Sequence, residues 1–300
     1  MITEPASAES LQVWRTGSRQ IVLDHPIVMG ILNVTPDSFS DGGNFFVPAN
    51  AIKRAVQMIH EGADIIDVGG ESTRPGAEPV SEEEERNRIT PVIAAVRERF
   101  PHLPISVDTM KATVAEAALA AVADIVNDVS ALRIDPAMAS LVAKSGCGVV
   151  LMHSRGSVAD MASYDHAVYQ DVTREVMSEL GSQLLLAEEA GLNREFIAVD
   201  PGFGFSKRSE HSTALLRDLS RFRELDAPIV VGLSRKRFVR EAMESGEHSA
   251  LGIGSHMEGD VATVALNVLA LERGAQIFRV HDVRMTRKAL DAVWKVLTAG

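Results

Sequence analysis

Residues 105–129, ISVDTMKATVAEAALAAVADIVNDV, contain the pattern that decides the fold. The β-branched runs Ile105–Asp108 and Ile125–Val129 predict two strands, and the amphipathic segment between them predicts a helix that begins near Thr109. A strand, a helix and a second strand in this order form a β/α unit in which the two strands run parallel.

The same alternation runs from about residue 28 to the C-terminus, without a Pro/Gly/Ser-rich linker that would separate two domains. The predicted strands are Val28–Val34, Asp64–Val68, Ile105–Asp108, Ile125–Val129, Gly148–His153, Phe196–Asp200, Ile229–Leu233 and Ile277–His281. Eight parallel strands with crossover helices favour a closed (β/α)8 TIM barrel, and an open doubly wound sheet is the competing architecture. We therefore predict an α/β protein with a single barrel domain over residues 28–300. Residues 1–27 predict a short N-terminal β-hairpin, Leu11–Trp14 with Gln20–Leu23, that closes the bottom of the barrel.

The composition restricts the class of protein. The chain of 300 residues is 46% hydrophobic and 24% charged, which is enough apolar material for one large core. There is no run of about 18 uncharged apolar residues and no apolar N-terminal segment, so we expect a cytoplasmic protein that does not enter a membrane. The formal net charge of -11 argues against general binding to nucleic acid, so an anionic ligand would need a local basic site.

Polar residues follow the predicted strands at their C-terminal ends, although strands buried on both faces should be almost entirely apolar. In chain order they are Asn33, the Glu71–Arg74 run, Asp108, Asn127, His153, Asp200, the Ser234–Lys236 run, and Arg279 with His281. Taken singly, Asp108 can cap a helix and Asp200 can organise the turn that follows it. Asn127 and His153 can be hydrogen-bonded core residues. In a barrel, however, these ends converge on one rim, and one ligand pocket explains all of them together.

Two basic clusters lie at the ends of the last two predicted strands. In Ser234-Arg235-Lys236-Arg237 the cations fall where a helix is expected to begin, which opposes the helix dipole unless an anion is nearby. Arg279 and His281 are two residues apart in a strand, so they lie on the same face. Because barrel enzymes often hold phosphate groups after the last two strands, we predict an anion site here. A solvated run of surface charges is the alternative.

Longer motifs resemble one known family, the dihydropteroate synthases. Residues 30–43 (GILNVTPDSFSDGG) and 67–76 (DVGGESTRPG) resemble the two family signatures. Shorter matches follow in family order at residues 106–109, 127–129, 200–205, 232–237 and 279–282. No Walker, Rossmann, His-Glu-x-x-His, Gly-x-Ser-x-Gly or Cys-x-x-Cys motif is present, which removes the commoner nucleotide, zinc, esterase and thiol chemistries. The resemblance implies a TIM-barrel enzyme that joins 6-hydroxymethyl-7,8-dihydropterin pyrophosphate to p-aminobenzoate, giving 7,8-dihydropteroate and pyrophosphate, with Mg²⁺ as cofactor.

The resemblance also implies roles for individual residues. Pterin would be bound by Asp108, Asn127, Asp200, Lys236 and Arg279, and pyrophosphate by Asn33, Thr73, Arg74, Arg279 and His281. The aminobenzoate pocket would be formed by Thr73, Phe205, Ser234 and Lys236, and Asn33 would be the residue linked to Mg²⁺. The catalytic residues would be Asp37, Lys236, Arg279 and His281. In the implied reaction the arylamine displaces pyrophosphate from the pterin methylene carbon without a protein nucleophile, while Mg²⁺ and basic residues stabilise the departing charge.

The chain departs from the family pattern at two places. It has Ser154 where many members have a methionine after Met-His, and Ser206-Lys207-Arg208 where many have Gly/Ala-Lys-Thr. Both places lie beside the residues that are expected to hold pterin. We expect them to affect substrate affinity and the response to sulfonamides, and not the reaction itself.

Two other functions stay open at this point. A methyltetrahydrofolate-dependent corrinoid methyltransferase shares a pterin-binding barrel, but it would have little use for basic clusters on the last two strands. A non-catalytic pterin-binding paralogue would be favoured by the loss of Asn33, Lys236 or Arg279, and all three are present. We also expect a homodimer, because residues 261–271 predict a helix that is apolar almost all round, and one apolar face suffices to cover a strand.

Overall fold

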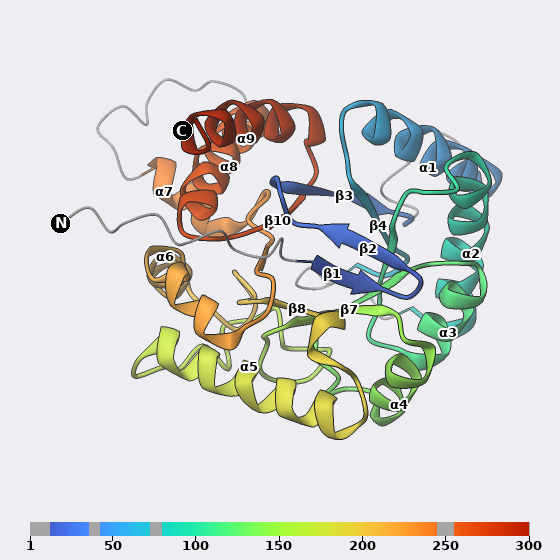
Figure 1. Ribbon diagram of the computed structural model, residues 1–300, viewed down its shortest axis with the longest axis horizontal. Coiled ribbons are helices and arrows are strands. Elements are labelled where there is room, and N and C mark those ends of the chain that lie inside the picture. The colour runs from blue at the N-terminus through green and yellow to red at the C-terminus, as the bar shows by residue number, and fades with distance from the viewer. Residues whose placement is uncertain (1–12, 36–42, 73–79, 245–254, 300) are drawn as a thin grey trace.

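The computed structural model describes residues 13–35, 43–72, 80–244 and 255–299, in which an 8-stranded parallel sheet has the order β8-β7-β6-β5-β4-β3-β10-β9. Its strands are β3 (Ile27–Asn33), β4 (Ile65–Gly69), β5 (Ile105–Asp108), β6 (Ile125–Asp128), β7 (Gly148–Met152), β8 (Ile197–Asp200), β9 (Val230–Val231) and β10 (Ile277–Val280). A parallel bridge between Val199 and Ile229 joins the outer strands β8 and β9, so the sheet closes into a barrel (Figure 1). The predicted TIM-barrel class is confirmed, and the alternative prediction of an open doubly wound sheet is wrong.

The strand β9 is the largest departure from the predicted boundaries. The sequence predicts a strand over Ile229–Leu233, whereas β9 consists of Val230 and Val231 alone. Only these two residues are in register with β10, where they pair with Ile277 and Phe278. The chain therefore leaves the sheet two residues earlier than expected and enters the segment that carries Ser234 and Lys236.

The described helices form a ring outside the strands (Figure 1). They are α1 (Gly43–His60), α2 (Glu82–Arg99), α3 (Ala112–Ala120), α4 (Pro136–Ser145), α5 (Val172–Glu189), α6 (Ser209–Arg217), α7 (Arg237–Glu244), α8 (Ser255–Glu272) and α9 (Val283–Leu297), with short 3₁₀ segments η2 (Arg194–Phe196) and η3 (Leu219–Leu225). The boundaries of α4 follow from sequence: Asp135 caps its first turn by accepting from the Ala137 amide at 2.9 Å, and Pro136 occupies the first helical position. Gly146 ends it with a φ of 63°.

The alternation of side chains along β4 explains how a polar residue enters the barrel. Ile66 and Val68 belong to the large core between strands and helices, whereas Ile65 belongs to a separate cluster inside the barrel. Because successive side chains of a strand point to opposite faces, Asp67 points inward as Ile65 does. The barrel interior therefore changes from apolar at the N-terminal end of β4 to polar toward its C-terminal end.

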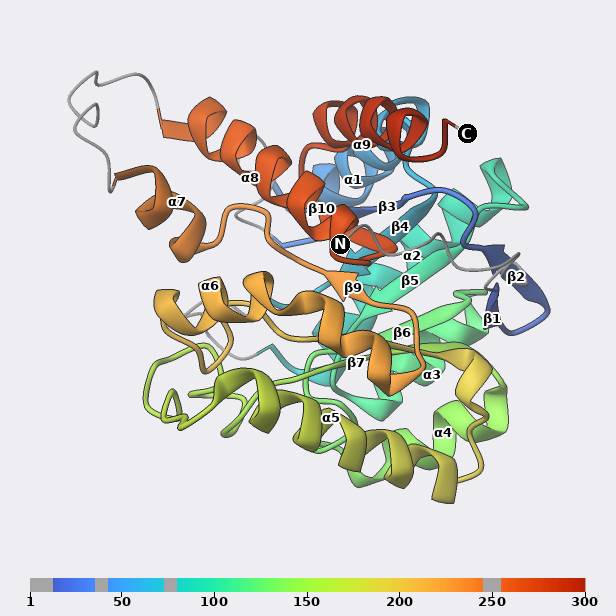
Figure 2. The ribbon, with the colours of Figure 1, turned by 60° about the vertical axis from the view of Figure 1, so that its left-hand side comes forward.

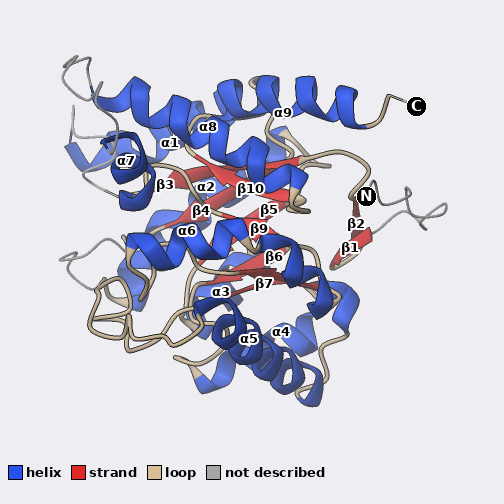
Figure 3. Cartoon of the chain, turned by 90° about the vertical axis from the view of Figure 1, so that its left-hand side faces the viewer, coloured by secondary structure: helices blue, strands red, loops and turns tan. Residues whose placement is uncertain are grey.

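An N-terminal hairpin covers the apolar end of the barrel. It consists of β1 (Val13–Thr16) and β2 (Arg19–Val22), which pair antiparallel. Trp14 is fully buried in the inner cluster with Ile27 and Ile65, and its indole N–H donates to the carbonyl oxygen of Phe196 at 2.9 Å. The predicted hairpin is therefore present, and Figure 3 shows it at the opposite end of the barrel from α7.

A membrane span is not found among the described helices, because none is both long and apolar enough to cross a bilayer. Figure 2 shows the helices packed around the barrel, with α8 and α9 side by side.

Candidate active site

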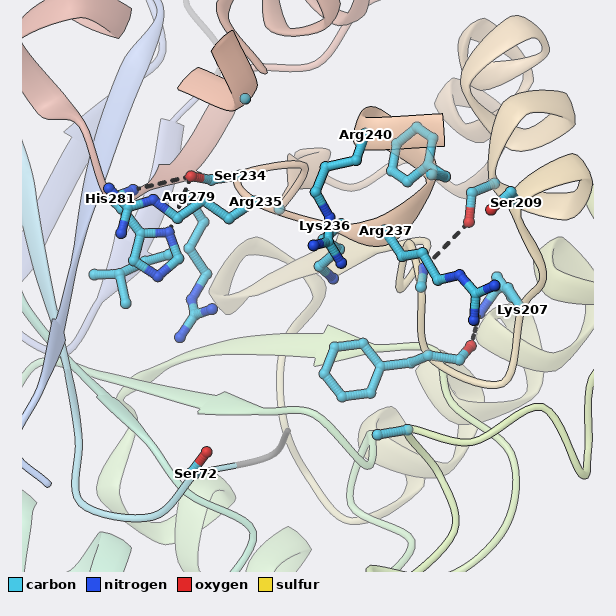
Figure 4. Close-up of a pocket in the computed structure, with 18 of the residues that line it drawn as sticks. Ser72, Lys207, Ser209, Ser234, Arg235, Lys236, Arg237, Arg240, Arg279 and His281 are labelled. Atoms are coloured by element: carbon cyan, nitrogen blue, oxygen red, sulfur yellow. Dashed lines mark hydrogen bonds between the residues drawn. The ribbon is translucent and has the colours of Figure 1, made fainter. Parts of the chain in front are cut away.

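A cavity of about 1080 Å³ opens where the strands of the barrel end. Strands and the segments that follow them supply the lining residues, among them Ile31 and Asn33 from β3, Glu71 and Ser72 after β4, Asp108 from β5, Gly232, Ser234 and Lys236 after β9, Arg279 from β10 and His281 directly after it. The β8–α6 segment adds Gly204, Phe205 and Lys207 (Figure 4). Most of the polar strand ends that the sequence predicts to converge therefore line this cavity, whereas Asn127, His153 and Asp200 do not.

Arg279 joins two carboxylates from different strands. Its Nε donates to Oδ2 of Asp67 at 2.6 Å, and its Nη2 donates to Oδ2 of Asp108 at 2.5 Å. Asn127 donates its side-chain amide to the same Asp67 oxygen at 3.1 Å. Four residues that are far apart in sequence thus form one network, and the direction of the Arg279 guanidinium is set by both carboxylates.

Asp67 was not singled out as a site residue, although it is fully buried and holds both Arg279 and Asn127. A sequence signal existed, because an aspartate in the middle of the apolar run Ile65–Gly69 violates the composition of a strand buried on both faces. Asp67 lies within β4 and not at its end, so the pattern of polar strand ends does not include it.

The same network alters the protonation of Asp108. Burial raises the pKa of Asp108 to about 7, Arg279 acts to lower it, and the negative charge of Asp67 acts to raise it. One guanidinium therefore faces two carboxylates, and cannot fully compensate for both charges in a site removed from water. Asp108 changes its charge near neutral pH, which is unusual for a carboxyl group.

Asp200 is buried at the end of β8 and does not itself line the cavity. Its Oδ1 accepts from the Gly202 amide at 2.7 Å, so the structural alternative, in which Asp200 organises the following turn, is also right. Burial raises the pKa of Asp200, and Lys236 acts against this shift. Gly202 has a φ of +72°, and a β-carbon there would lie 1.8 Å from the carbonyl oxygen of His153, so only glycine fits this turn.

Lys236 enters the cavity from the segment between β9 and α7. Its ammonium group donates to the carbonyl oxygen of Phe203 and lies 4.5 Å from the centre of the Phe205 ring. Burial lowers the pKa of Lys236 to about 8, while the carboxyl group of Asp200 acts to raise it. This side chain can therefore donate to a ligand and still exchange its proton in the physiological range.

The other cations of this segment make different contacts. Arg235 pairs with Asp260 at 3.3 Å, and Arg237 pairs with Glu241 at 2.6 Å, with about half or more of each arginine side chain exposed. Both line the outer part of the cavity, but each already has a carboxylate partner. Lys236 is therefore the cation of this run that faces the buried carboxyl groups, and α7 begins only at Arg237.

His281 and Ser234 bring the ends of β10 and β9 together. The Ser234 hydroxyl lies 2.9 Å from Nδ1 of His281 and accepts from the His281 amide at 3.3 Å. Arg54 of α1 donates to the His281 carbonyl oxygen at 3.0 Å. Both Ser234 and His281 line the cavity close to Arg279, so the two predicted basic clusters do meet (Figure 4).

His153 is not part of the cavity wall. Its Nε2 lies 3.0 Å from a carboxylate oxygen of Glu179, and its Nδ1 lies 2.8 Å from Nζ of Lys207. It borders a separate cavity of about 130 Å³ on the outside of the barrel. The structural alternative for His153, a hydrogen-bonded core residue, is the right one. Lys207 lines the main cavity instead, and nothing in the sequence distinguished it from an exposed lysine.

Asn33 lies at the end of β3 and Gly69 at the end of the neighbouring β4. Because Gly69 has no side chain, the space between the side chains of Asn33 and Asp108 stays open. A β-carbon on Gly69 would lie 3.7 Å from the Asn33 amide oxygen and 3.5 Å from Cβ of Asp108. Both side chains line the cavity at this point. Asp37, Thr73 and Arg74, which the resemblance assigns to catalysis and to pyrophosphate, lie outside the described residues.

Comparisons with known proteins agree with this site. A model of the family of pterin binding enzymes matches residues 29–281. A dihydropteroate synthase of Streptococcus pyogenes is 45% identical over 266 residues, which are 89% of this chain and 94% of that protein.

Two solved structures resemble the chain over nearly its whole length. A Xanthomonas albilineans dihydropteroate synthase structure with 4-aminobenzoic acid has a TM-score of 0.87 at 42% identity, and covers 97% of this chain and 100% of the other. A second structure from that organism, in complex with 7,8-dihydropteroate, has a TM-score of 0.82 at 40% identity, and covers 95% and 99% of the two chains. The chain therefore belongs to the dihydropteroate synthases, a group of pterin-binding enzymes.

Proposed function

We propose that this enzyme condenses 6-hydroxymethyl-7,8-dihydropterin pyrophosphate with p-aminobenzoate to give 7,8-dihydropteroate and pyrophosphate. The observation that carries the proposal is the set of polar side chains at this end of the barrel: Asp108, Lys236 and Arg279 line the cavity. Asn127, which pairs with Asp108 across the sheet, and Asp200 are buried and do not themselves line it. Relatives that bear the name of this activity, and one structure with 7,8-dihydropteroate, support the same conclusion.

The pterin is proposed to lie against the network around Arg279. Carboxylate and amide oxygens of Asp108, Asn127 and Asp200 suit the N–H groups of an amino-pyrimidine ring, because an ionised carboxylate only accepts hydrogen bonds. Lys236 would donate to the carbonyl side of the ring. Arg279, whose guanidinium is already held by two carboxylates, would present its flat face to the ring and its charge to the pyrophosphate.

Pyrophosphate is proposed to lie beside Asn33, His281 and Arg279, with Thr73 and Arg74 as further contacts that rest on the resemblance alone. The contact between Ser234 and Nδ1 of His281 holds the imidazole ring at the cavity wall. Stabilisation of the departing charge by these groups allows the carbon–oxygen bond to break before the new bond is complete. Asp37, outside the described residues, is proposed to act in the same step.

The arylamine is proposed to bind beside Phe205, Ser234 and Lys236, with Thr73 at the same pocket. Its nitrogen lone pair attacks the pterin methylene carbon as the bond to pyrophosphate breaks, and the amine loses one proton. The free base at nitrogen is the nucleophile, so no protein side chain forms a covalent intermediate.

Magnesium is proposed as the cofactor, with Asn33 as its protein ligand. Among the described residues there is no group of three or more His, Cys, Asp or Glu side chains that could hold a metal ion. Mg²⁺ commonly keeps several waters and binds through few protein oxygens together with substrate phosphates. A single amide oxygen on the cavity wall fits an ion that enters with the pyrophosphate, where it would neutralise part of the leaving charge.

A direct assay tests the proposed function. The protein is incubated with both substrates and Mg²⁺, and dihydropteroate is measured by chromatography, with Lys144→Met as a control variant on the exposed surface of α4. Lys236→Met should lose most of the activity and the control should keep it. A folded protein that binds the pterin in a calorimeter but forms no product would instead support the non-catalytic paralogue. Calorimetry of pyrophosphate with and without Mg²⁺ tests the metal independently of turnover.

A homodimer formed partly by α8 is also proposed. Val261 of this helix is 54% exposed, and on the neighbouring α9 the exposed fractions are 74% for Val296 and 50% for Leu297. These apolar side chains do not form one patch, since Val261 lies in the first half of α8 and Val296 and Leu297 lie at the end of α9, but each would be covered if another chain packed along both helices. Sedimentation velocity at micromolar concentration should show a dimer, and a monomer at every concentration tested would contradict this proposal.

A further inference from the structure

The turn between β8 and α6, residues 201–206, has an unusual backbone and carries Phe205. Gly202, Gly204 and Ser206 have positive φ angles of +72°, +76° and +49°. The carbonyl oxygens of this turn reach two lysine side chains: those of Gly202 and Phe205 accept from Lys207, and that of Phe203 accepts from Lys236. The turn is therefore held by two lysine side chains, Lys207 and Lys236, both labelled in Figure 4.

Lys207 is only 1% exposed, and its Nζ atom is surrounded by hydrogen-bond acceptors. It lies 2.8 Å from Nδ1 of His153, 2.9 Å from the Phe205 oxygen, 3.0 Å from the Gly202 oxygen and 3.3 Å from the His153 oxygen. Burial lowers the pKa of Lys207 well below its ordinary value. Because a polar group is costly to bury without partners, a lysine in this position needs such a set of acceptors.

His153 completes the anchor on the side of β7. Burial lowers the pKa of His153 to about 3, and Lys207 acts in the same direction, so the imidazole is neutral near pH 7. A neutral ring can accept from Lys207 at Nδ1 while its Nε2–H donates to Glu179 at 3.0 Å. Lys207 therefore links the turn to a residue that is itself fixed.

Ser206, one of the departures from the family pattern, adds a second attachment. Its amide donates to the Met161 carbonyl oxygen at 2.8 Å, and its hydroxyl donates to the Arg155 oxygen at 2.7 Å. Tyr169 donates to the Ser206 oxygen at 3.1 Å. The Phe205 side chain, between the two attachments, packs with a small cluster that includes Met161.

We propose that Lys207 is a positioning residue for the arylamine subsite, which it holds by fixing the 201–206 turn and with it Phe205 and the carbonyl group that binds Lys236. This inference rests on the proposed function, in which Phe205 and Lys236 contact the arylamine. Of the residues proposed to hold the pterin, Asp108 and Asn127 depend on Asp67 and Arg279 and do not contact the turn. Asp200 and Lys236 do contact it, through the Gly202 amide and the Phe203 carbonyl oxygen. Because Phe205 belongs to the turn itself, Lys207 acts on the arylamine more than on the pterin.

The kinetic test separates the two substrates. Lys207→Met keeps the length of the side chain but removes its donors, so the KM for p-aminobenzoate should rise about tenfold, equivalent to about 1.4 kcal/mol. The KM for the pterin pyrophosphate should rise less than this, because Asp108 and Asn127 do not contact the turn. Lys207→Gln keeps two N–H donors and should recover part of the loss. Lys144→Met, which removes an exposed lysine, should change neither value.

Hydrogen exchange measures the turn without turnover. In Lys207→Met the amides of residues 202–206 should exchange at least about tenfold faster, whereas those of the hairpin, residues 13–22, should not change. Unchanged KM values and unchanged exchange in a folded variant would overturn the proposal, as would an equal rise of both KM values. If Lys207→Met does not fold, the same comparison is made with Lys207→Gln. If the wild-type protein makes no dihydropteroate, the proposed function fails, and exchange still decides whether Lys207 holds the turn.

Discussion

The substitution Asp67→Asn tests the network around Arg279 most directly. Oδ2 of Asp67 accepts from Arg279 at 2.6 Å and from Asn127 at 3.1 Å, while Oδ1 has no partner among the described residues. An asparagine has nearly the same shape, so its oxygen can take the place of Oδ2 and its amide group that of Oδ1. The change therefore removes one negative charge and leaves the packing intact.

The expected loss of stability follows from these contacts. A hydrogen bond to a charged group contributes about 1.5–3 kcal/mol, and breaking a buried ion pair completely costs about 3–5 kcal/mol. Arg279 keeps its contact with Asp108 at 2.5 Å, so it is not left without a carboxylate. We expect Asp67→Asn to lower the free energy of unfolding by about 2 kcal/mol, measured by equilibrium denaturation.

The larger effect concerns protonation. In the native protein burial raises the pKa of Asp108 to about 7, and the charge of Asp67 contributes to this rise. Without that charge Arg279 faces a single carboxylate, so the pKa of Asp108 should fall. If ionised Asp108 binds the pterin, kcat/KM for the pterin pyrophosphate should decline as pH falls below about 7 in the wild type, and only at lower pH in the variant.

Profiles of kcat/KM against pH measure this shift, and Asp64→Asn is the matched control. Asp64 directly precedes β4 and pairs with Arg287 at 2.8 Å at the opposite end of the strand from the cavity. The control should lose stability and keep the wild-type profile. An acid limb that stays in place in Asp67→Asn, or that moves to higher pH, would refute the argument that Asp67 controls the charge of Asp108.

Three further predictions follow from single contacts. Asp108→Asn and Asp200→Asn should each weaken pterin binding in calorimetry by about 1.5–3 kcal/mol with the barrel still folded, and unchanged affinity in both would rule out the proposed pterin pocket. Gly202→Ala should lower the free energy of unfolding by more than about 3 kcal/mol, because its β-carbon would lie 1.8 Å from the His153 oxygen. In the same denaturation experiment Gly146→Ala is the control: its β-carbon would meet nothing within 4 Å, so it should lower the free energy of unfolding by only about 1 kcal/mol. Ser234→Ala removes the contact with Nδ1 of His281 at 2.9 Å and should weaken binding of pyrophosphate by about 1 kcal/mol, with unchanged calorimetric affinity as the contrary result.

The sequence alone was sufficient to predict the order of strands and helices and the rim on which the polar residues meet. Both depend on local properties: β-branched runs predict strands, and a polar residue at the end of a buried strand is recognisable without knowledge of its neighbours. For this reason Asn33, Asp108, Arg279 and His281 were predicted and do line the cavity. Motif resemblance added the family and the expected substrates.

The partners of these side chains were decided by the tertiary structure. Asp67 and Arg279 are 212 positions apart in sequence. They meet because the sheet places β10 beside β3 and β3 beside β4, so the two side chains lie two strands apart. His153 does not line the cavity, whereas Lys207 does. Lys207 is held there by carbonyl oxygens of the 201–206 turn, and no local sequence pattern predicts those contacts. Periodicity states which face of a strand a residue occupies. It does not state which residue from another strand will face it, because that depends on register and closure of the whole sheet.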